Sequence, residues 1–388
     1  MQPYTTPPWS FPYCPTPPHW RLDWTDIERQ FQWIRAMAGV EQDPIYHAEG
    51  DVLIHTHMVA EQLVRLDAWR MLPQEERMQV FAAALLHDVA KPQCTSIEED
   101  GRIHSRGHAR SGEHMARRIL WSGDELPHPL PFAIREQIAR LVCFHGLPLH
   151  FLDKPQPERA VIKASMSTRL DYVALLAEAD VRGRICADQS ELLERIELFR
   201  EFCKELNCYN HPRPFASPHS RFVYFHNERA HPDYAAYDDT TFEVVLMAGL
   251  PGVGKDSWVA QHLNDWPVIS LDEIRKVLQI SPEDNQGQVI QTAKEQARIY
   301  MRQQQSFTWN ATNVTRPLRE QLVNFFASYR ARVRIVYLDA PLEMILGRNK
   351  KRSASVPETI MNKLLDKLDV PDMTEAHMVQ WELLQGPD

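Results

Sequence analysis

The sequence predicts two domains, an all-helical domain followed by an α/β domain built on a parallel sheet. Between residues 24 and 207, apolar residues recur at three- and four-residue spacing, which is the period of an amphipathic helix. After residue 241, short β-branched and aromatic runs alternate with helix-length polar stretches, a pattern typical of parallel strands joined by helices. With 388 residues, the chain is long enough to bury two separate cores.

Changes in composition divide the chain into four predicted segments. Residues 1–22 are rich in proline and are expected to form a stiff, extended arm. The helical domain occupies residues 23–207 and the α/β domain residues 241–388. The intervening residues 208–240 are rich in Pro, His, Tyr and Asn, and we interpret them as a linker. Within this linker, the run RFVYF at 221–225 is the one candidate for a short strand.

Composition excludes several classes of protein. No apolar run approaches the roughly 20 residues of a membrane span, and the N-terminal stretch lacks the pattern of a secretory signal. The six cysteines are scattered without a Cys-x-x-Cys pair, which fits a reducing cytoplasm, and we expect no membrane partner. A net charge of -9 argues against a general nucleic-acid coat, so any polynucleotide must be held locally.

A glycine-rich loop follows the first predicted strand of the α/β domain. The stretch GLPGVGKDS lies between the apolar run FEVVLMA and a helical stretch, which is the context of a Walker A phosphate loop. A plain glycine turn with an exposed lysine is the alternative, and the strand, spacing and lysine together disfavour it. We expect ATP, GTP or another nucleoside triphosphate to bind here with Mg²⁺. The residues predicted to bind it in this loop are Gly249, Gly252, Gly254, Lys255, Asp256 and Ser257.

The position after the lysine departs from the usual motif. It normally carries a Ser or Thr that binds magnesium, whereas this chain has Asp256 followed by Ser257. A carboxylate is an acceptable ligand for Mg²⁺, either directly or through water, but it also adds negative charge beside the phosphates. The sequence leaves the magnesium contact of Asp256 open.

Two further groups in the α/β domain suit phosphoryl transfer. Asp272 closes the strand-like run PVISLD and is a candidate general base for the acceptor hydroxyl, although a helix N-cap role is the alternative, which Ser270 supplies equally well. Arg275 lies three residues on, on the same helix face, where it is placed to hold an acceptor phosphate. Arg348 and Arg352 belong to a basic run that is usually a solvated face, but at i and i+4 they can reach ATP phosphates together.

These motifs together resemble a known kinase family. GLPGVGKDSW, SLDEIR, WNATN and RNKKR, in that order, resemble the kinase domain of polynucleotide 5′-hydroxyl kinases of the phage and bacterial RNA-repair type. The resemblance covers residues 241 to about 352. It implies that Asp272 is the general base on the 5′-OH, that Arg275 clamps the adjacent phosphate, and that Arg348 and Arg352 are lid arginines over the nucleotide.

The helical domain carries an ordered set of histidines and aspartates. A single histidine is more often an ordinary core or surface side chain, but here His87-Asp88 ends an apolar helix within the run HDVAK, and other candidates follow the same order on other helices. Six nitrogen and oxygen ligands of this kind can enclose two divalent metals, with Asp88 bridging them. The predicted ligands are His55, His87, Asp88, His108, His145 and Asp180. His57, His104 and His114 are left undecided.

The order His, His-Asp, His, His, Asp resembles the HD phosphohydrolase superfamily. Two metals would activate a bridging water and stabilise charge on phosphorus, which implies a phosphoesterase. Lys91 is placed to help hold the scissile phosphate. Mn, Fe, Co, Ni and Zn all tolerate these ligands, so the metal stays open.

Over nearly the whole chain, the combination resembles the bacterial HD-Pnk end-healing enzymes. The resemblance implies hydrolysis of 2′,3′-cyclic phosphate and 2′- or 3′-phosphate ends by the helical domain, and phosphorylation of 5′-OH ends of RNA or DNA by the kinase. A separate polynucleotide ligase would then seal the ends. One alternative is a nucleotide or second-messenger phosphohydrolase fused to a small-molecule kinase. Another is a regulatory module that binds ATP and metal without turnover, which the intact Lys255, Asp272 and ligand set disfavour.

Overall fold

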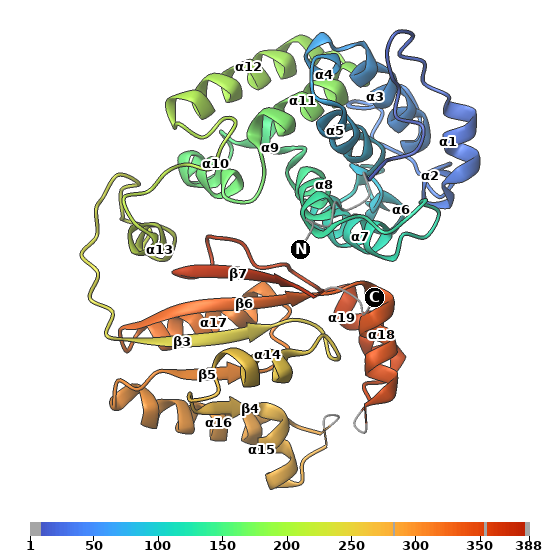
Figure 1. Cartoon of the computed structure of the whole chain (residues 1–388). Helices are drawn as coiled ribbons and strands as arrows, with labels where there is room; N and C mark the ends of the chain where they lie inside the picture. Colours follow the sequence, from blue (N-terminus) through green and yellow to red (C-terminus); the bar gives the residue numbers. More distant parts are fainter. Residues whose placement is uncertain (1–8, 282–283, 353–354, 385–388) are drawn as a thin grey trace. The chain divides into compact units, whose positions relative to one another are not determined.

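The chain forms two compact units, which we call the helical unit (Met1–Pro214) and the α/β unit (Phe215–Asp388). The computed structural model describes residues 9–281, 284–352 and 355–384 (Figure 1). In these described ranges, no helix has the length and apolar character needed to cross a membrane. The predicted fold class, a helical domain followed by an α/β domain with a parallel sheet, is confirmed.

The helical unit consists of helices with one two-stranded hairpin. Its elements are α1 (Trp24–Gln30), α2 (Gln32–Arg35), α3 (Val52–Arg65), α4 (Asp67–Arg70), α5 (Gln74–Leu86), α6 (Lys91–Cys94), β1 (Ser96–Ile97), β2 (Ile103–His104), α7 (His108–Ser122), α8 (Phe132–Phe144), α9 (Leu147–His150), α10 (Pro157–Ser165), α11 (Leu170–Arg182) and α12 (Gln189–Glu205).

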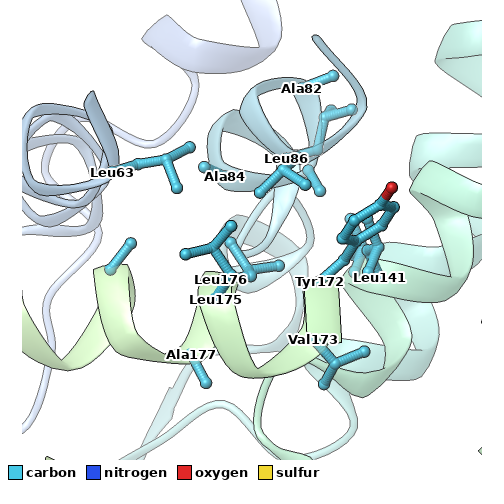
Figure 2. Close-up of a cluster of buried hydrophobic side chains, with 14 of the residues drawn as sticks. Leu63, Ala82, Ala84, Leu86, Leu141, Tyr172, Val173, Leu175, Leu176 and Ala177 are labelled. Carbon is cyan, nitrogen blue, oxygen red and sulfur yellow. The ribbon is translucent and has the colours of Figure 1, made fainter. Parts of the chain in front are cut away.

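Four of these helices, α3, α5, α8 and α11, surround the centre of the unit. The run FAAALL makes the second half of α5 apolar on every side, so residues 78–86 are buried while the first turn is not, and α11 is buried along most of its length. Figure 2 shows side chains of this cluster, among them Leu63, Leu86, Leu141 and Leu176. Truncating such a leucine to alanine typically costs about 2 to 5 kcal/mol, so this cluster fixes where the helix ends lie.

The described part of the N-terminal arm, residues 9–22, is not the extended rod that its prolines suggested. It contains turns and packs on the helical unit. Phe11 is buried and stacks on Phe31, and the Trp20 ring lies edge-on against Trp69. The aromatic residues between the prolines therefore anchor this segment to the core.

The α/β unit is built on one parallel sheet. Its elements are α13 (Pro218–His226), β3 (Phe242–Ala248), α14 (Lys255–His262), β4 (Val268–Ser270), α15 (Leu271–Leu278), α16 (Gly287–Arg302), β5 (Phe307–Asn310), α17 (Arg316–Ala327), β6 (Ala331–Asp339), α18 (Leu342–Lys351), α19 (Glu358–Leu365) and β7 (Met378–Leu383). The strand order is β4-β5-β3-β6-β7, and every neighbouring pair is parallel (Figure 1).

The strand order positions the functional loops. The central strand β3 is buried along nearly its whole length and pairs with both β5 and β6. In a parallel sheet, all carboxyl ends lie at the same edge, and ligands bind there, where the strand order reverses. The loops after β3, β4 and β5 therefore open at one edge, and these are the loops that carry the predicted kinase residues.

One local prediction was wrong. The run RFVYF, a candidate strand, lies inside helix α13 (Pro218–His226). Ser217 caps this helix by accepting a hydrogen bond from the N–H of Ser220, and Pro218 occupies its first turn. The helix packs within the α/β unit, where Phe222 stacks on His377 with ring centroids 3.7 Å apart.

Candidate metal centre and phosphate-binding site

The six predicted metal ligands of the helical unit come together at helix ends. His87 caps the C-terminus of α5, with Asp88 next in the chain, and His145 caps the C-terminus of α8. His55 lies in the first turn of α3, His108 begins α7, and Asp180 lies in the last turn of α11. The core that packs these helices therefore brings the six side chains to one point.

Asp88 lies at the centre of this group. Its Oδ2 oxygen is 3.2 Å from Nε2 of His87 and 3.9 Å from Nε2 of His55. Its Oδ1 oxygen is 3.4 Å from Nε2 of His108. We call the atoms around Oδ2 position 1, which also includes Asp180, whose Oδ1 lies 3.1 Å from His55 Nε2.

The atoms around Oδ1 of Asp88 form position 2. They include Nε2 of His108 and Nε2 of His145, which lie 3.3 Å apart. Two ligand atoms that bind one metal at about 2.1 Å lie roughly 3.0 to 3.4 Å from each other. The spacings in both positions fit this range except the 3.9 Å between Asp88 Oδ2 and His55 Nε2, which suits ligands at a wider angle on one cation. Each position would thus hold one cation, and Asp88 would offer one oxygen to each.

The hydrogen bonds behind the histidines set their tautomers. Nδ1 of His87 lies 2.8 Å from the carbonyl oxygen of Ala84, and Nδ1 of His145 lies 2.7 Å from that of Val142. These carbonyls belong to last helical turns, which lack intrahelical donors. Because a carbonyl only accepts, each ring carries its proton on Nδ1 and directs the lone pair of Nε2 inward.

Facing lone pairs favour a bound cation. Nε2 of His55 and Nε2 of His87 are only 3.4 Å apart. In position 2, the Nε2 atoms of His108 and His145 are 3.3 Å apart. Two ring nitrogens at this distance need a cation between them. Without a metal, burial is outweighed by Asp88, which raises the pKa of His87, and a bound metal would take the place of the proton. The residues present therefore fit a pair of divalent metals.

Electrostatic interactions keep the two carboxylates of the centre in the charged form that binds metals. Burial alone would raise the pKa of Asp88, but the neighbouring His87 and Lys91 hold it well below its usual range. Burial, together with His108 and His87, lowers the pKa of His145 to about 3, so this imidazole stays neutral and can bind metal. The pKa of Asp180 is likewise held low, although burial opposes this, because Arg184 lies beside it.

Arg184, Gln42 and Glu49, which the sequence did not single out, surround the centre together with the predicted Lys91. Arg184 donates two hydrogen bonds to Asp180, over 3.0 and 2.6 Å. Lys91, predicted to hold the scissile phosphate, contacts Asp88 Oδ2 at 2.7 Å and donates to Gln42 Oε1 at 2.7 Å. Oε1 of Glu49 lies 2.8 Å from Nδ1 of His55. Glu49 and Gln42 belong to a loop without a motif, so the sequence alone carried no signal for them, whereas Arg184 lies at helical spacing from Asp180.

The undecided histidines lie apart from the two positions. His57 stacks on Trp24 with ring centroids 4.3 Å apart, and its Nε2 lies 3.5 Å from Glu61. Nε2 of His104 lies 3.4 Å from Glu98 in the β1–β2 hairpin. His55, preferred over His57 from the sequence pattern, is the residue within the cluster.

In the α/β unit, the glycine-rich loop connects β3 to α14. Its three glycines all have positive φ, at 139° for Gly249, 86° for Gly252 and 106° for Gly254. A Cβ on Gly249 would lie 2.9 Å from the carbonyl oxygen of Leu338. A Cβ on Gly252 would lie 2.8 Å from that of Ile345 in α18. Only glycine fits these close approaches, and the loop ends at the positive N-terminus of α14.

Lys255 is the first residue of α14 and folds back onto the loop. Its Nζ donates to the carbonyl oxygens of Gly249 and Leu250, over 2.9 and 3.0 Å. Burial lowers the pKa of Lys255 to about 8. The ammonium group therefore occupies the mouth of the loop, where phosphate oxygens can replace these carbonyls as its acceptors.

The atypical Asp256 has a defined partner. Asn310, the last residue of β5, donates from Nδ2 to Asp256 Oδ1 over 2.6 Å. Asn310 is buried and belongs to the WNATN motif, whereas Asp256 and Ser257 are exposed. The second carboxylate oxygen of Asp256 remains available for a cation or its water shell.

Asp272 stands in the first turn of α15 with arginines on both sides. Ser270 accepts the hydrogen bond from Glu273 N–H and is the helix N-cap, so the capping alternative for Asp272 is excluded. Asp272 forms an ion pair with Arg275, and its Oδ2 lies 3.9 Å from Arg352. Its side chain is 63% exposed, which leaves the carboxylate accessible to an acceptor.

The predicted arginines gather near these residues. Arg352 caps the C-terminus of α18 and approaches Asp272, and Arg348 lies in the last turn of the same helix. A Cβ on Gly254 would lie 3.8 Å from a terminal nitrogen of Arg348, so this guanidinium lies at the phosphate loop. Nε of Arg275 donates to Gln286 over 2.6 Å.

A cavity of about 260 Å³ lies beside Arg275. Its walls are mostly apolar, with amides and one lysine among them, and are formed by Leu271, Arg275, Gln286, Ile290, Lys294, Trp309, Ala311, Thr312, Asn313, Leu318, Gln321 and Leu322. Asp272, the phosphate loop and this cavity thus all lie at the carboxyl edge of the sheet.

Comparison with protein families agrees with both sites. Residues 52–176 match the HD domain, and residues 244–371 match an AAA domain. The chain joins an HD domain to a P-loop kinase-like domain. The HD domain implies divalent metals, and the kinase-like domain implies a nucleotide with Mg²⁺.

Three curated proteins show partial similarity. The chain is 23% identical over 147 residues to the L-seryl-tRNA(Sec) kinase of Methanococcus maripaludis, a match that covers 36% of this chain and 56% of that protein. It is 27% identical over 174 residues to the multifunctional CCA protein of Pasteurella multocida, covering 42% and 38%. The corresponding protein of Mannheimia succiniciproducens is 27% identical over 167 residues, covering 41% and 37%. The chain thus spans about half or less of these relatives.

Proposed function

We propose that this protein heals broken nucleic-acid ends. The HD domain hydrolyses 2′,3′-cyclic phosphate and 2′- or 3′-phosphate ends, and the kinase-like domain transfers the γ-phosphate of a nucleoside triphosphate to a 5′-OH end. The observation that carries the proposal is Asp272, an accessible carboxylate held between Arg275 and Arg352. A base beside a cation that can hold a phosphate suits a hydroxyl on a phosphodiester chain better than an isolated hydroxyl.

In the kinase reaction, the chain's residues exchange partners as substrates bind. Lys255 leaves the carbonyls of the loop and binds the transferring phosphates, and Arg348 and Arg352 neutralise charge on the far side. Arg275 moves from Asp272 to the phosphate next to the acceptor hydroxyl. Asp272, released from this ion pair, then takes the proton from the 5′-OH. The hydroxyl oxygen attacks the γ-phosphorus, and the nucleoside diphosphate leaves.

In the HD domain, the six ligands hold the metals and neighbouring cations hold the substrate. When bound there, two divalent metals of the group Mn, Fe, Co, Ni and Zn would supply an activated water and stabilise the developing charge on phosphorus. Asp88 keeps the two positions together through its separate oxygens. Lys91 contacts Asp88 and is placed to reach a phosphate oxygen at the same centre.

The named relatives support an RNA-linked substrate. One is a kinase of L-seryl-tRNA(Sec), whose acceptor is part of an RNA conjugate, and the other two are named as CCA proteins. In this proposal a separate polynucleotide ligase seals the healed ends in the cytoplasm. The cavity beside Arg275 favours one alternative, a small-molecule acceptor for the kinase, together with a nucleotide phosphohydrolase in the HD domain.

The test offers both kinds of end to the full-length protein. Label should pass from ATP with Mg²⁺ to a 5′-OH oligonucleotide, and not to the same oligonucleotide that already carries a 5′-phosphate. With Mn²⁺ or Ni²⁺, the protein should hydrolyse a 2′,3′-cyclic phosphate RNA first to a 2′- or 3′-monophosphate and then, with release of inorganic phosphate, to an end that carries both the 2′-OH and the 3′-OH. RNA and DNA substrates compared in parallel show which polymer is preferred. Free nucleosides test the alternative of a small-molecule acceptor. Label on nucleosides but not on oligonucleotides would exclude the end-healing function.

A further inference from the structure

A buried glutamate lies behind one of the predicted ligands. Glu49 belongs to the loop that precedes α3, and its side chain has no exposed surface. Its Oε1 oxygen lies 2.8 Å from Nδ1 of His55 and 2.8 Å from Nδ1 of His47. The other oxygen, Oε2, accepts a hydrogen bond from the backbone N–H of Ile185 over 2.8 Å. Three donors therefore converge on one carboxylate.

The close contact at Nδ1 determines which nitrogen of His55 carries the lone pair. A carboxylate oxygen 2.8 Å from Nδ1 is favourable only when that nitrogen carries the ring proton, which leaves the lone pair on Nε2. Nε2 is the atom that lies 3.4 Å from His87 Nε2 and 3.1 Å from Asp180 Oδ1. A carboxylate behind the ring also makes Nε2 a stronger donor to a cation.

The same loop is tied to the segment that holds Asp180. The N–H of Ala48 donates to the carbonyl oxygen of Ile185 over 3.0 Å, beside the bond from Ile185 to Glu49. Arg184, the residue before Ile185, donates both of its bonds to Asp180. Glu49 thus links the two ligands of position 1 that come from α3 and α11. In position 2, the Nδ1 atoms of the histidines contact backbone carbonyls instead.

We propose that Glu49 is a positioning residue for position 1 alone. It orients His55 directly, ties its loop to the segment after Asp180, and leaves position 2, formed by His108 and His145, unchanged. The proposal rests on the proposed binding of two metals by the HD domain. Its distinguishing consequence is that removal of the carboxylate weakens one of two metal sites and not both.

The experiment measures Mn²⁺ binding to the metal-free, full-length protein by isothermal titration calorimetry. Wild type should bind two equivalents. Glu49→Gln should weaken one of them by about 10- to 100-fold, the usual effect of losing an outer partner of a ligand, and leave the other within about threefold. Two backgrounds assign the effect. With position 1 disabled by Asp180→Asn, Glu49→Gln should not change the remaining site, and with position 2 disabled by His145→Asn it should show its full effect.

A matched control and a milder variant accompany this comparison. Glu61 lies on α3 and pairs with His57 outside the metal centre, so Glu61→Gln should leave both affinities unchanged. His47→Phe removes one donor to Glu49 at the edge of the cluster, and it should weaken position 1 by a smaller factor even if Glu49→Gln fails to fold. A His47→Phe protein with wild-type affinities in both positions would count against the proposal.

Three results would overturn the role of Glu49. They are unchanged affinities in Glu49→Gln, an equal loss in the two backgrounds, and a third equivalent of Mn²⁺ in wild type that disappears in Glu49→Gln, since Glu49 would then be a ligand itself. Failure of the proposed function looks different. Wild-type protein that binds no Mn²⁺ would overturn the metal-dependent phosphoesterase, whereas two bound equivalents with an inert Glu49 would overturn only the inference drawn here.

Discussion

Asn310 Nδ2 donates a hydrogen bond to Asp256 Oδ1 over 2.6 Å, joining the end of β5 to the phosphate loop. The bond occupies one carboxylate oxygen and orients the other. The residue after the loop lysine is therefore held rigidly although it departs from the common Ser or Thr. This arrangement suggests that Asp256 contributes to Mg²⁺ binding, which leads to the first prediction.

Asp256→Asn should raise the Mg²⁺ concentration needed for half-maximal kinase activity by about tenfold, because a lost charge near the cation costs about 1.4 kcal/mol at an exposed site. The measurement is a magnesium titration of kinase rate at saturating nucleotide. Asp265→Asn, at an exposed position after α14, is the control and should leave the titration unchanged. An unchanged magnesium requirement in Asp256→Asn would show that Asp256 makes no contact with the metal.

Asp272→Asn should lower kcat of the kinase by about 10²- to 10⁴-fold, because the acceptor hydroxyl loses its general base. The phosphoesterase rate of the same preparation should stay at the wild-type level. Glu273→Gln is the matched control. Glu273 is the next residue and forms an exposed ion pair with Lys276, so its loss should change kcat of the kinase by less than about twofold. A kinase rate near wild type in Asp272→Asn would remove Asp272 from the mechanism.

Asp88→Asn should impair the phosphoesterase and spare the kinase. Loss of the bridging carboxylate removes a shared ligand from both positions, so phosphoesterase activity should fall by at least about 100-fold, since even an outer partner is worth 10 to 100. Kinase activity should persist. Asp100→Asn, in the exposed turn between β1 and β2, should affect neither rate. Loss of both activities in a folded Asp88→Asn protein would contradict independent sites.

ATP affinity should decline above pH 8. Burial lowers the pKa of Lys255 to about 8 in the free protein, and bound phosphates raise it. Below pH 8, Lys255 is charged in both the free and the ATP-bound protein, so ATP affinity does not change with pH. Above it, binding takes up a proton, and ATP affinity should fall about fivefold from pH 8 to 9, approaching about tenfold per pH unit at higher pH.

Calorimetry in two buffers of different ionisation enthalpy at pH 9 measures this proton uptake directly. Lys255→Met should bind weakly and without the uptake. Lys276→Met, which removes an exposed lysine of α15, should keep it. The same uptake in wild type and Lys255→Met would assign the titration to another group.

The α/β unit should lose stability on acidification through His377. This ring stacks between His219 and Phe222, and its Nδ1 accepts a hydrogen bond from Val333 N–H over 3.1 Å. Burial lowers its pKa to about 3, below the unfolded value of about 6.5. Between these values the unfolded chain binds the extra proton, so the stabilisation is present above pH 6.5 and declines as pH falls.

The free energy of unfolding of the α/β unit should be about 2 kcal/mol lower at pH 5 than above pH 6.5, since each pH unit below 6.5 lowers it by about 1.4 kcal/mol. His377→Asn keeps an acceptor for Val333 N–H without the titration, so its stability should change less with pH. Hydrogen exchange of peptides from β6, corrected for intrinsic rates at pH 7.5 and 5.0, measures the difference. Equal pH dependence in both proteins would show that His377 does not control this loss.

The sequence predicted the elements with strong periodicity and missed those that depend on distant partners. Four strands and the central helices were visible because apolar patterns reflect burial. The strand β7 was not predicted, and α13 was predicted as strand, because the aromatic run RFVYF favours strand until it packs on His377. Ser217 and Pro218 were signals for that helix start.

The candidate sites divide in the same way. Residues in motifs, such as His87 and Lys255, could be located because their chemistry requires fixed neighbours in sequence. Glu49 could not, because it reaches His55 only after the loop before α3 has folded against the segment around Ile185. Arg184 lies four residues after Asp180, a helical spacing, but no motif singled it out.

The close approach of Gly252 to α18 has a mechanical consequence. The Ile345 carbonyl and the Asn349 amide leave no space for even one methyl group on the loop, so loop and helix cannot slide past each other. Arg348 therefore travels with the phosphate loop as part of one rigid body. Arg352, the C-cap of α18, lies outside this contact and approaches Asp272 instead. On the proposed function, we therefore expect Arg348 to stay at the phosphate loop and Arg352 to change partners when the nucleoside diphosphate leaves.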